Sequence, residues 1–231
     1  MIVCNRLASM FDYCCIVVML WYKSGRVRLD TLDDSDWKEA LCQKKRPIVT
    51  IVLVLINVAV WCILELMGNT LDGTFIAEYG GMYPELVRNG ETYRLFTAMF
   101  LHFGAEHLAN NMILLAAAGS KLEAAVGSIR YLMIYIGAGL AGNLLSFYVM
   151  IRSGAYAVCA GASGAVFGII GALAWAAIRN KGKIEGLTTK GLLFMILLCL
   201  YYGITTAGVD NWAHIGGVLG GFFLCIVLYR K

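Results

Sequence analysis

A serine flanked by glycines, Ser163, begins a long apolar run in the sequence GASGAVFG. Small residues let helices approach closely in lipid, so this stretch could serve helix packing alone. A serine held at the N-terminus of a helix could instead act as a nucleophile, provided that a base lies beside it. The stretch on its own favours packing, and the rest of the chain decides between the two interpretations.

Only three histidines, His102, His107 and His214, are available as the base. Imidazole titrates near neutral pH, which makes histidine the usual partner of a serine nucleophile. His107 and Asn111 are four residues apart and share a helix face. They either hydrogen-bond neighbouring helices or donate to a developing oxyanion. His102 would point about 140° away from His107 on one helix, and we expect it to tie the preceding loop down.

A metal site is the less favoured use of these histidines. His102 and His107 are badly spaced for one helix face, and the chain has no HExxH motif. The eight cysteines show no paired metal spacing, so we interpret them as small hydrophobic residues. We therefore expect neither a metal nor a cofactor.

The composition indicates where these polar residues must lie. Apolar residues make up 60% of the 231 residues and charged residues only 15%, whereas a soluble domain averages about half and about a quarter. The sequence therefore predicts an all-α, polytopic membrane protein. The net charge of +4 gives no reason to expect nucleic-acid binding, because Lys and Arg lie in short loops between apolar runs.

Six apolar runs approach the roughly 20 residues that cross a bilayer. We expect these spans at residues 48–67, 103–119, 131–151, 161–178, 192–206 and 212–229. Between them we expect short interfacial helices at 77–83 and 83–89, a polar break at 122–130 and a basic loop at 179–183.

The chain is expected to consist of two parts. Residues 1–46 form a short N-terminal cytosolic piece, in which residues 1–22 are either a buried strand of a truncated domain or an interfacial segment. Residues 47–231 form the membrane domain, a bundle of six transmembrane helices.

The distribution of positive charge predicts the orientation of the spans. With a cytosolic N-terminus, the cytosolic flanks carry eleven cations and the outer flanks three, which follows the positive-inside rule. The eleven are Lys44, Lys45, Arg46, Lys121, Arg130, Arg179, Lys181, Lys183, Lys190, Arg230 and Lys231, and the three are Arg88, Arg94 and Arg152. Both termini are then cytosolic, and Ser163 and the three histidines share one depth near the outer leaflet.

Glycines indicate how Ser163 and His214 could meet. Gly217 and Gly221 form a GxxxG pair on the 212–229 span, and the 161–178 span carries a glycine face of its own. That face consists of Gly164, Gly168 and Gly171. If the two faces pack together, Ser163 comes within reach of His214.

Two residues near this pair are given no chemical role. Phe167 lies four residues after Ser163, so its ring is expected one turn deeper on the same helix face. Asp210 lies one turn before His214 and could be a third member of a catalytic triad. A solvated carboxylate at the end of a loop is the favoured interpretation of Asp210.

Six motifs, found in order over roughly residues 48–231, resemble those of the rhomboid intramembrane serine proteases. GASG at 161–164 resembles the family's GxSG nucleophile motif, and AHIGG at 213–217 its AHxxG motif. The remaining matches are an upstream structural histidine (His102), the oxyanion pair (His107 and Asn111), an aromatic–Arg pair (Tyr93-Arg94) and GxxxExxxG (residues 119–127). The family often has tyrosine where this chain has Phe167, so Phe167 is expected to serve ring packing alone.

The resemblance implies peptide hydrolysis by a Ser–His dyad, with Ser163 as nucleophile and His214 as general base. The oxyanion would be held by the Ser163 backbone N–H and by the side chains of His107 and Asn111. The implied substrates are single-span or polytopic membrane proteins, which enter from the lipid bilayer and are cut near the outer leaflet. Structural roles near the site would fall to His102, Phe167, Gly161, Gly164 and Gly217.

Two other functions compete with proteolysis. A rhomboid-like protein could bind membrane proteins without cutting them, although both members of the dyad are present here. A small-solute transporter would show internal repeats and polar groups at mid-membrane, whereas these polar groups cluster near the outer surface. From its compactness and the lack of a targeting segment, we expect a multi-pass protein of the cell membrane, in a bacterial inner membrane.

Overall fold

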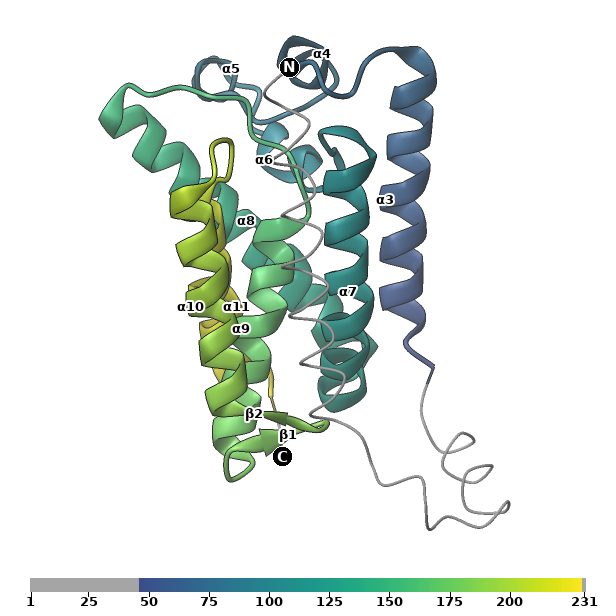
Figure 1. The fold of residues 1–231 in the computed structure, drawn as a ribbon, viewed down its shortest axis with the longest axis vertical. Coiled ribbons are helices and arrows are strands. Elements are labelled where there is room, and N and C mark those ends of the chain that lie inside the picture. Colours follow the sequence, from purple (N-terminus) through teal and green to yellow (C-terminus); the bar gives the residue numbers. More distant parts are fainter. Residues whose placement is uncertain (1–45, 230–231) are drawn as a thin grey trace.

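The computed structural model describes residues 46–229 of the chain. The predicted segment at residues 1–22, and nearly all of the predicted N-terminal piece, lie outside the described residues. Within these residues the structure has six long helices, which run side by side along the longest axis of the molecule (Figure 1). They are α3 (Ile48–Met67), α7 (Gly104–Val126), α8 (Ser128–Ser153), α9 (Ser163–Arg179), α10 (Thr189–Thr205) and α11 (Asn211–Leu228).

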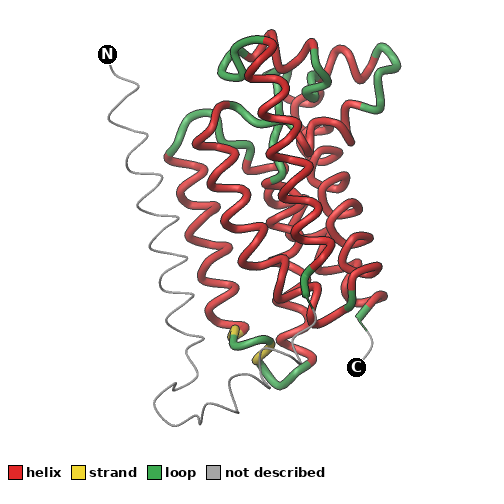
Figure 2. Tube along the Cα trace, turned by 90° about the vertical axis from the view of Figure 1, so that its right-hand side faces the viewer, coloured by secondary structure: helices red, strands yellow, loops and turns green. Residues whose placement is uncertain are grey.

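Short elements gather at the two ends of this bundle (Figures 1 and 2). One end, here called the α4–α6 end, carries α4 (Gly73–Glu78), α5 (Pro84–Arg88), α6 (Arg94–Thr97) and the 3-10 helix η2 (Ala98–Phe100). The other, here called the hairpin end, carries an antiparallel pair of strands, β1 (Lys183–Ile184) and β2 (Leu187–Thr188). This hairpin begins at Lys183, the last residue of the expected basic loop, and was not predicted.

The helices differ in their capacity to cross a membrane. By length and composition, α3, α8 and α11 are long and apolar enough, whereas α9 and α10 are apolar but shorter, at 17 residues each. Helix α9 is an interior helix, because 13 of its 17 residues are buried. It packs against α7, α8, α10 and α11.

The expected polar break at 122–130 is wrong, since α7 continues to Val126 and only Gly127 separates it from α8. Gly127 has φ +83°, a conformation that favours glycine. The helix is not broken at Glu123 because this carboxylate is buried and fully bonded. It accepts hydrogen bonds from Val49 N (3.0 Å), Thr50 N (2.9 Å), Thr50 Oγ1 (2.8 Å) and Ser128 Oγ (2.7 Å).

Side-chain caps explain two further shifts from the expected boundaries. Asp72 accepts a hydrogen bond from Thr74 N and starts α4 at Gly73, four residues before the expected interfacial helix. Thr188 accepts a hydrogen bond from Gly191 N and starts α10 at Thr189 instead of residue 192. The helix predicted at 48–67 is confirmed by α3, which has the same bounds.

The predicted meeting of the two glycine faces is confirmed. A Cβ on Gly217 would collide with the backbone oxygen of Gly164, and one on Gly221 with that of Gly168. At the adjacent position, about 100° around the helix, α11 meets α8, where a Cβ on Gly216 would lie 2.8 Å from Ala141 O. Helix α11 therefore packs against both α8 and α9 at backbone contact distance, and its contact with Gly164 places its first turns beside the first turn of α9.

Candidate active site

Ser163 and His214 meet at the α4–α6 end of the bundle. Ser163 is the first residue of α9 and His214 the fourth residue of α11. His214 Nε2 lies 3.1 Å from Ser163 Oγ, within hydrogen-bonding distance. His214 is buried and Ser163 half-buried. A serine hydroxyl in contact with an imidazole nitrogen can lose its proton to that nitrogen.

The imidazole of His214 is held by packing. The Phe167 ring stacks on it, with a centroid separation of 4.1 Å and an interplanar angle of 7°. Its second nitrogen, Nδ1, is buried and has no hydrogen-bond partner among residues 46–229. No described residue therefore orients the imidazole by bonding to Nδ1.

His107 lies beside Gly161, two residues before Ser163. Its Nδ1 accepts a hydrogen bond from Phe103 N at 3.3 Å, so the neutral ring carries its proton on Nε2. A Cβ on Gly161 would lie 3.0 Å from His107 Nε2 and 3.8 Å from Ser163 Oγ, so both atoms border the space beside the Gly161 Cα. Gly161 also has φ +143°, which side chains rarely adopt.

Asn111 lies one turn along α7 from His107 and is 5% exposed. Its Nδ2 donates a hydrogen bond to His107 O at 2.9 Å, which commits one of its two N–H groups. Both residues project from the first two turns of α7, and this helix begins at the same end of the bundle as α9 and α11.

His102 lies before α7, which begins at Gly104, so the expected 140° separation on one helix does not apply. Its ring centroid is 5.2 Å from that of His107. Burial lowers the pKa of His102, which keeps the ring neutral and leaves a nitrogen able to accept. His102 Nε2 accepts a hydrogen bond from Ala162 N at 3.3 Å, and this bond joins the end of the preceding loop to the residue before Ser163.

Comparison with known proteins decides the family. A family model described as the rhomboid domain matches residues 89–231, which is more than half of the chain. The chain belongs to the rhomboid family. Since it also has apolar helices long enough to cross a bilayer, this rhomboid is an integral membrane protein.

Several curated relatives carry the rhomboid name. The chain is 33% identical to "Rhomboid protease GluP" of Bacillus subtilis over 189 residues, which is 82% of the chain and 36% of GluP. It is 40% identical to "RHOMBOID-like protein 5" of Arabidopsis thaliana, over 68% of the chain and 50% of that protein. It is 30% identical to "RHOMBOID-like protein 7" of the same plant, over 86% of the chain and 69% of that protein. The chain thus spans about a third of GluP and half of RHOMBOID-like protein 5.

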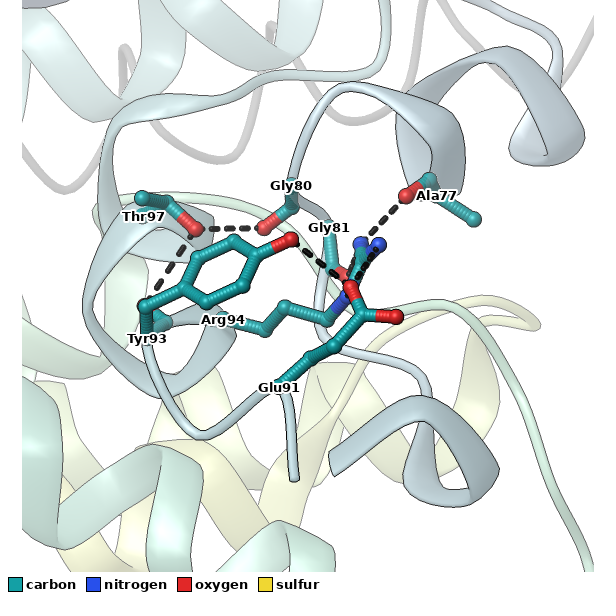
Figure 3. A network of polar contacts seen from close by, with 7 residues as sticks. All are labelled: Ala77, Gly80, Gly81, Glu91, Tyr93, Arg94 and Thr97. Atoms are coloured by element: carbon teal, nitrogen blue, oxygen red, sulfur yellow. Dashed lines mark hydrogen bonds and ion pairs between the residues drawn. The ribbon is translucent and has the colours of Figure 1, made fainter. Parts of the chain in front are cut away.

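The rhomboid chain holds its long loop between α3 and α7 with a buried arginine (Figure 3). Arg94 Nη1 donates to Ala77 O and, at 3.0 Å, to Gly81 O. Its guanidinium also pairs with Glu91 at 2.7 Å, and Tyr93 OH donates to the same carboxylate oxygen at 2.7 Å. The sequence singled out Tyr93 and Arg94 but missed Glu91, because any of several carboxylates in the loop could have been the partner.

This loop reaches the site through η2, which follows α6. Ala98 O accepts a hydrogen bond from Gly161 N at 2.9 Å, two residues before Ser163. The stretch before Ser163 is thus fixed by η2 and by His102, both from the chain that precedes α7.

Asp210 is not the solvated carboxylate that the sequence favoured. Its Oδ1 accepts a hydrogen bond from Ala213 N at 3.0 Å, and its Oδ2 accepts one from Ser146 Oγ. The first bond caps α11, and the second links α11 to α8. Sequence reasoning missed Ser146, because a lone serine in an apolar span has no local pattern that names its partner.

Proposed function

We propose that this rhomboid is an intramembrane serine endopeptidase that uses Ser163 as nucleophile and His214 as general base. The observation that carries the proposal is the 3.1 Å separation of Ser163 Oγ and His214 Nε2. In this mechanism Ser163 Oγ attacks the scissile carbonyl while His214 Nε2 takes its proton, and His214 then protonates the leaving amine. Water subsequently hydrolyses the acyl-enzyme.

We assign the oxyanion to the Ser163 backbone N–H with the side chains of His107 and Asn111. The hydrogen bond from Phe103 N supports this assignment, because it leaves the proton of His107 on Nε2, the nitrogen that borders Gly161 two residues before Ser163. Asn111 retains one Nδ2–H group beyond the bond to His107 O. His102, Phe167, Gly161, Gly164 and Gly217 serve as supports of this arrangement in the proposal.

The membrane topology in the proposal has six spans, α3 and α7 to α11, with both termini in the cytosol. The exposed cations Arg179, Lys181, Lys183 and Lys190 at the hairpin end support this orientation. A helix of 17 residues spans about 25 Å, less than a hydrocarbon core of about 30 Å. With Arg179 at the inner surface, Ser163 therefore lies just below the outer surface, where water can reach it.

The substrates in this proposal are membrane proteins whose spans enter sideways and unwind near the outer leaflet. Residues 47–231 form the protease domain, and residues 1–46 form a cytosolic piece outside it. The bacterial relative GluP supports a bacterial cell membrane as the location.

The proposal is tested by the same substitution at two serines. Wild type, Ser163→Ala and the control Ser153→Ala, an exposed residue at the end of α8, are purified in detergent. Each is treated with a fluorophosphonate probe, which phosphonylates activated serines, and with a panel of single-span membrane proteins. Wild type and Ser153→Ala are expected to be labelled and to cleave, and Ser163→Ala to do neither.

Two results would contradict the proposal. Cleavage by Ser163→Ala at the wild-type rate would exclude Ser163 as the nucleophile. A wild type that is neither labelled nor active on any member of the panel would instead favour a rhomboid-like protein that binds membrane proteins without cutting them.

A further inference from the structure

The first turn of α11, which carries His214, is held by Asp210. Asp210 Oδ1 accepts a hydrogen bond from Ala213 N at 3.0 Å, and Asp210 O accepts one from His214 N at 3.2 Å. Since His214 Nδ1 has no partner within residues 46–229, the ring's position follows from the placement of this turn and from the Phe167 ring.

The other oxygen of Asp210 anchors this turn to a neighbouring helix. Oδ2 accepts a hydrogen bond from Ser146 Oγ, and Ser146 lies completely buried in α8. A hydrogen bond to a carboxylate is shorter and stronger than one between neutral groups. The carboxylate therefore fixes the end of α11 both along its own axis and sideways against α8.

The same anchor lies next to the segment that leads into Ser163. Cys159 Sγ is 3.9 Å from Ser146 Oγ, and Cys159 lies four residues before Ser163. Its backbone pairs with Met82 in both directions, at 2.8 and 2.9 Å. Asp210 and Ser146 thus connect the start of α11, the helix that carries His214, to the segment that leads into Ser163.

On the basis of the proposed function, we propose that Asp210 is a positioning residue for His214. It sets the separation of His214 and Ser163 by locking the first turn of α11 to Ser146 on α8. It touches neither the substrate nor the imidazole nitrogens. A displacement of about 1 Å at a reacting pair can lower a rate by up to about a hundredfold, so loosening this turn slows the reaction.

The test uses the full chain in detergent and the rate of Ser163 labelling by a fluorophosphonate probe, so that no natural substrate is needed. Labelling is followed against probe concentration, which separates the maximal rate from the half-saturating concentration, and across neutral to mildly alkaline pH. The variants are Asp210→Ala, Asp210→Asn, Ser146→Ala and the double variant with alanine at both positions. Asp72→Ala is the matched control, because the Asp72 side chain likewise accepts a backbone N–H at the start of a helix, α4.

Asp210→Ala is expected to lower the maximal labelling rate roughly tenfold and to leave the half-saturating concentration unchanged. Asp210→Asn keeps an oxygen for Ala213 N and a polar group for Ser146, so it is expected to stay within about threefold of wild type. Ser146→Ala should fall between the two and add little to Asp210→Ala, since the bond is already absent there. Asp72→Ala should label like wild type.

Three results would overturn the inference. An Asp210→Ala protein with a lower thermal midpoint but a wild-type labelling rate would reduce Asp210 to a helix cap. An altered pH profile in Asp210→Asn would instead show that the charge of the Asp210 carboxylate acts directly on His214. If Asp210→Ala does not fold, a wild-type rate in Ser146→Ala overturns it. Labelling of Ser163→Ala, or none of wild type, would show that the proposed function itself had failed.

Discussion

Two sets of buried polar residues lie at opposite ends of the bundle, and they differ in how fully their hydrogen-bonding groups are used. At the hairpin end, Glu123 accepts four hydrogen bonds from α3 and α8. At the α4–α6 end, His214 contacts Ser163 through one nitrogen and has no partner for the other within the described residues. A fully bonded buried group fixes a structure, whereas a partly bonded one remains available to a reacting molecule.

The largest effect that tests this contrast is expected from Asn111→Ala. The substitution removes the Nδ2–H group that has no partner within residues 46–229 and is proposed to hold the oxyanion. Loss of one such donor lowers kcat by about 10²–10³-fold. Cleavage of a single-span substrate measures kcat, and Asn110→Ala, a change at the neighbouring buried asparagine, is the control. Equal losses in both variants would contradict the assignment.

Glu123→Gln should have the opposite profile, with a loss of stability and little change in the reaction of the folded protein. The amide places an NH₂ group where the carboxylate accepted hydrogen bonds, and an unpaired buried donor costs about 1–3 kcal/mol. We expect a lower thermal midpoint in detergent and a labelling rate per folded molecule close to wild type. Glu85→Gln, at an exposed position in α5, should change neither quantity. A large fall in labelling by folded Glu123→Gln would show that the two ends are coupled.

Phe167→Leu should lie between these cases, because it removes the ring that holds His214. Stacked aromatic pairs contribute about 0.5–1.5 kcal/mol, so we expect labelling to slow by about two- to tenfold. Phe167→Tyr keeps the ring and should remain near the wild-type rate. Equal rates for Phe167→Leu and wild type would mean that helix packing alone positions the imidazole.

The smallest effect is expected at Glu91, in a network that is half open to solvent. Its hydrogen bond from Tyr93, together with Arg94, lowers the pKa of the Glu91 carboxyl. A carboxyl with a lowered pKa stabilises the fold above its unfolded pKa and loses this contribution as the pH falls through its folded value. When the pH is lowered below about 4.5, the thermal midpoint of wild type should therefore decrease by more than the thermal midpoint of Glu91→Gln. Parallel curves for the two proteins would contradict this expectation.

The sequence predicted those features that are repeated along one helix. Apolar runs located the long helices, and the glycine faces of α9 and α11 correctly brought Ser163 beside His214. Residues four apart, such as Ser163 and Phe167, could be placed on one face without knowledge of the fold.

Contacts between distant segments were the part that could not be predicted. Glu123 bonds to two residues of α3 that lie more than 70 positions away, and nothing in its neighbourhood in the sequence names them. Arg94 bonds to backbone oxygens, which every residue possesses and no residue type reveals. For the same reason Asp210 was placed in solvent, because Ser146, its partner on α8, lies 64 positions away.

The geometry at Gly161 has a consequence for genetics. Every amino acid other than glycine would add a Cβ at a backbone φ of +143° and against the His107 ring. All missense codons at this position should therefore inactivate the protein. A saturation screen scored by proteolysis would rank Gly161 beside Ser163, although it contributes no side-chain atom to the reaction. In such a screen, intolerance to substitution would identify the backbone position that supports the nucleophile, Gly161, as strongly as the nucleophile, Ser163.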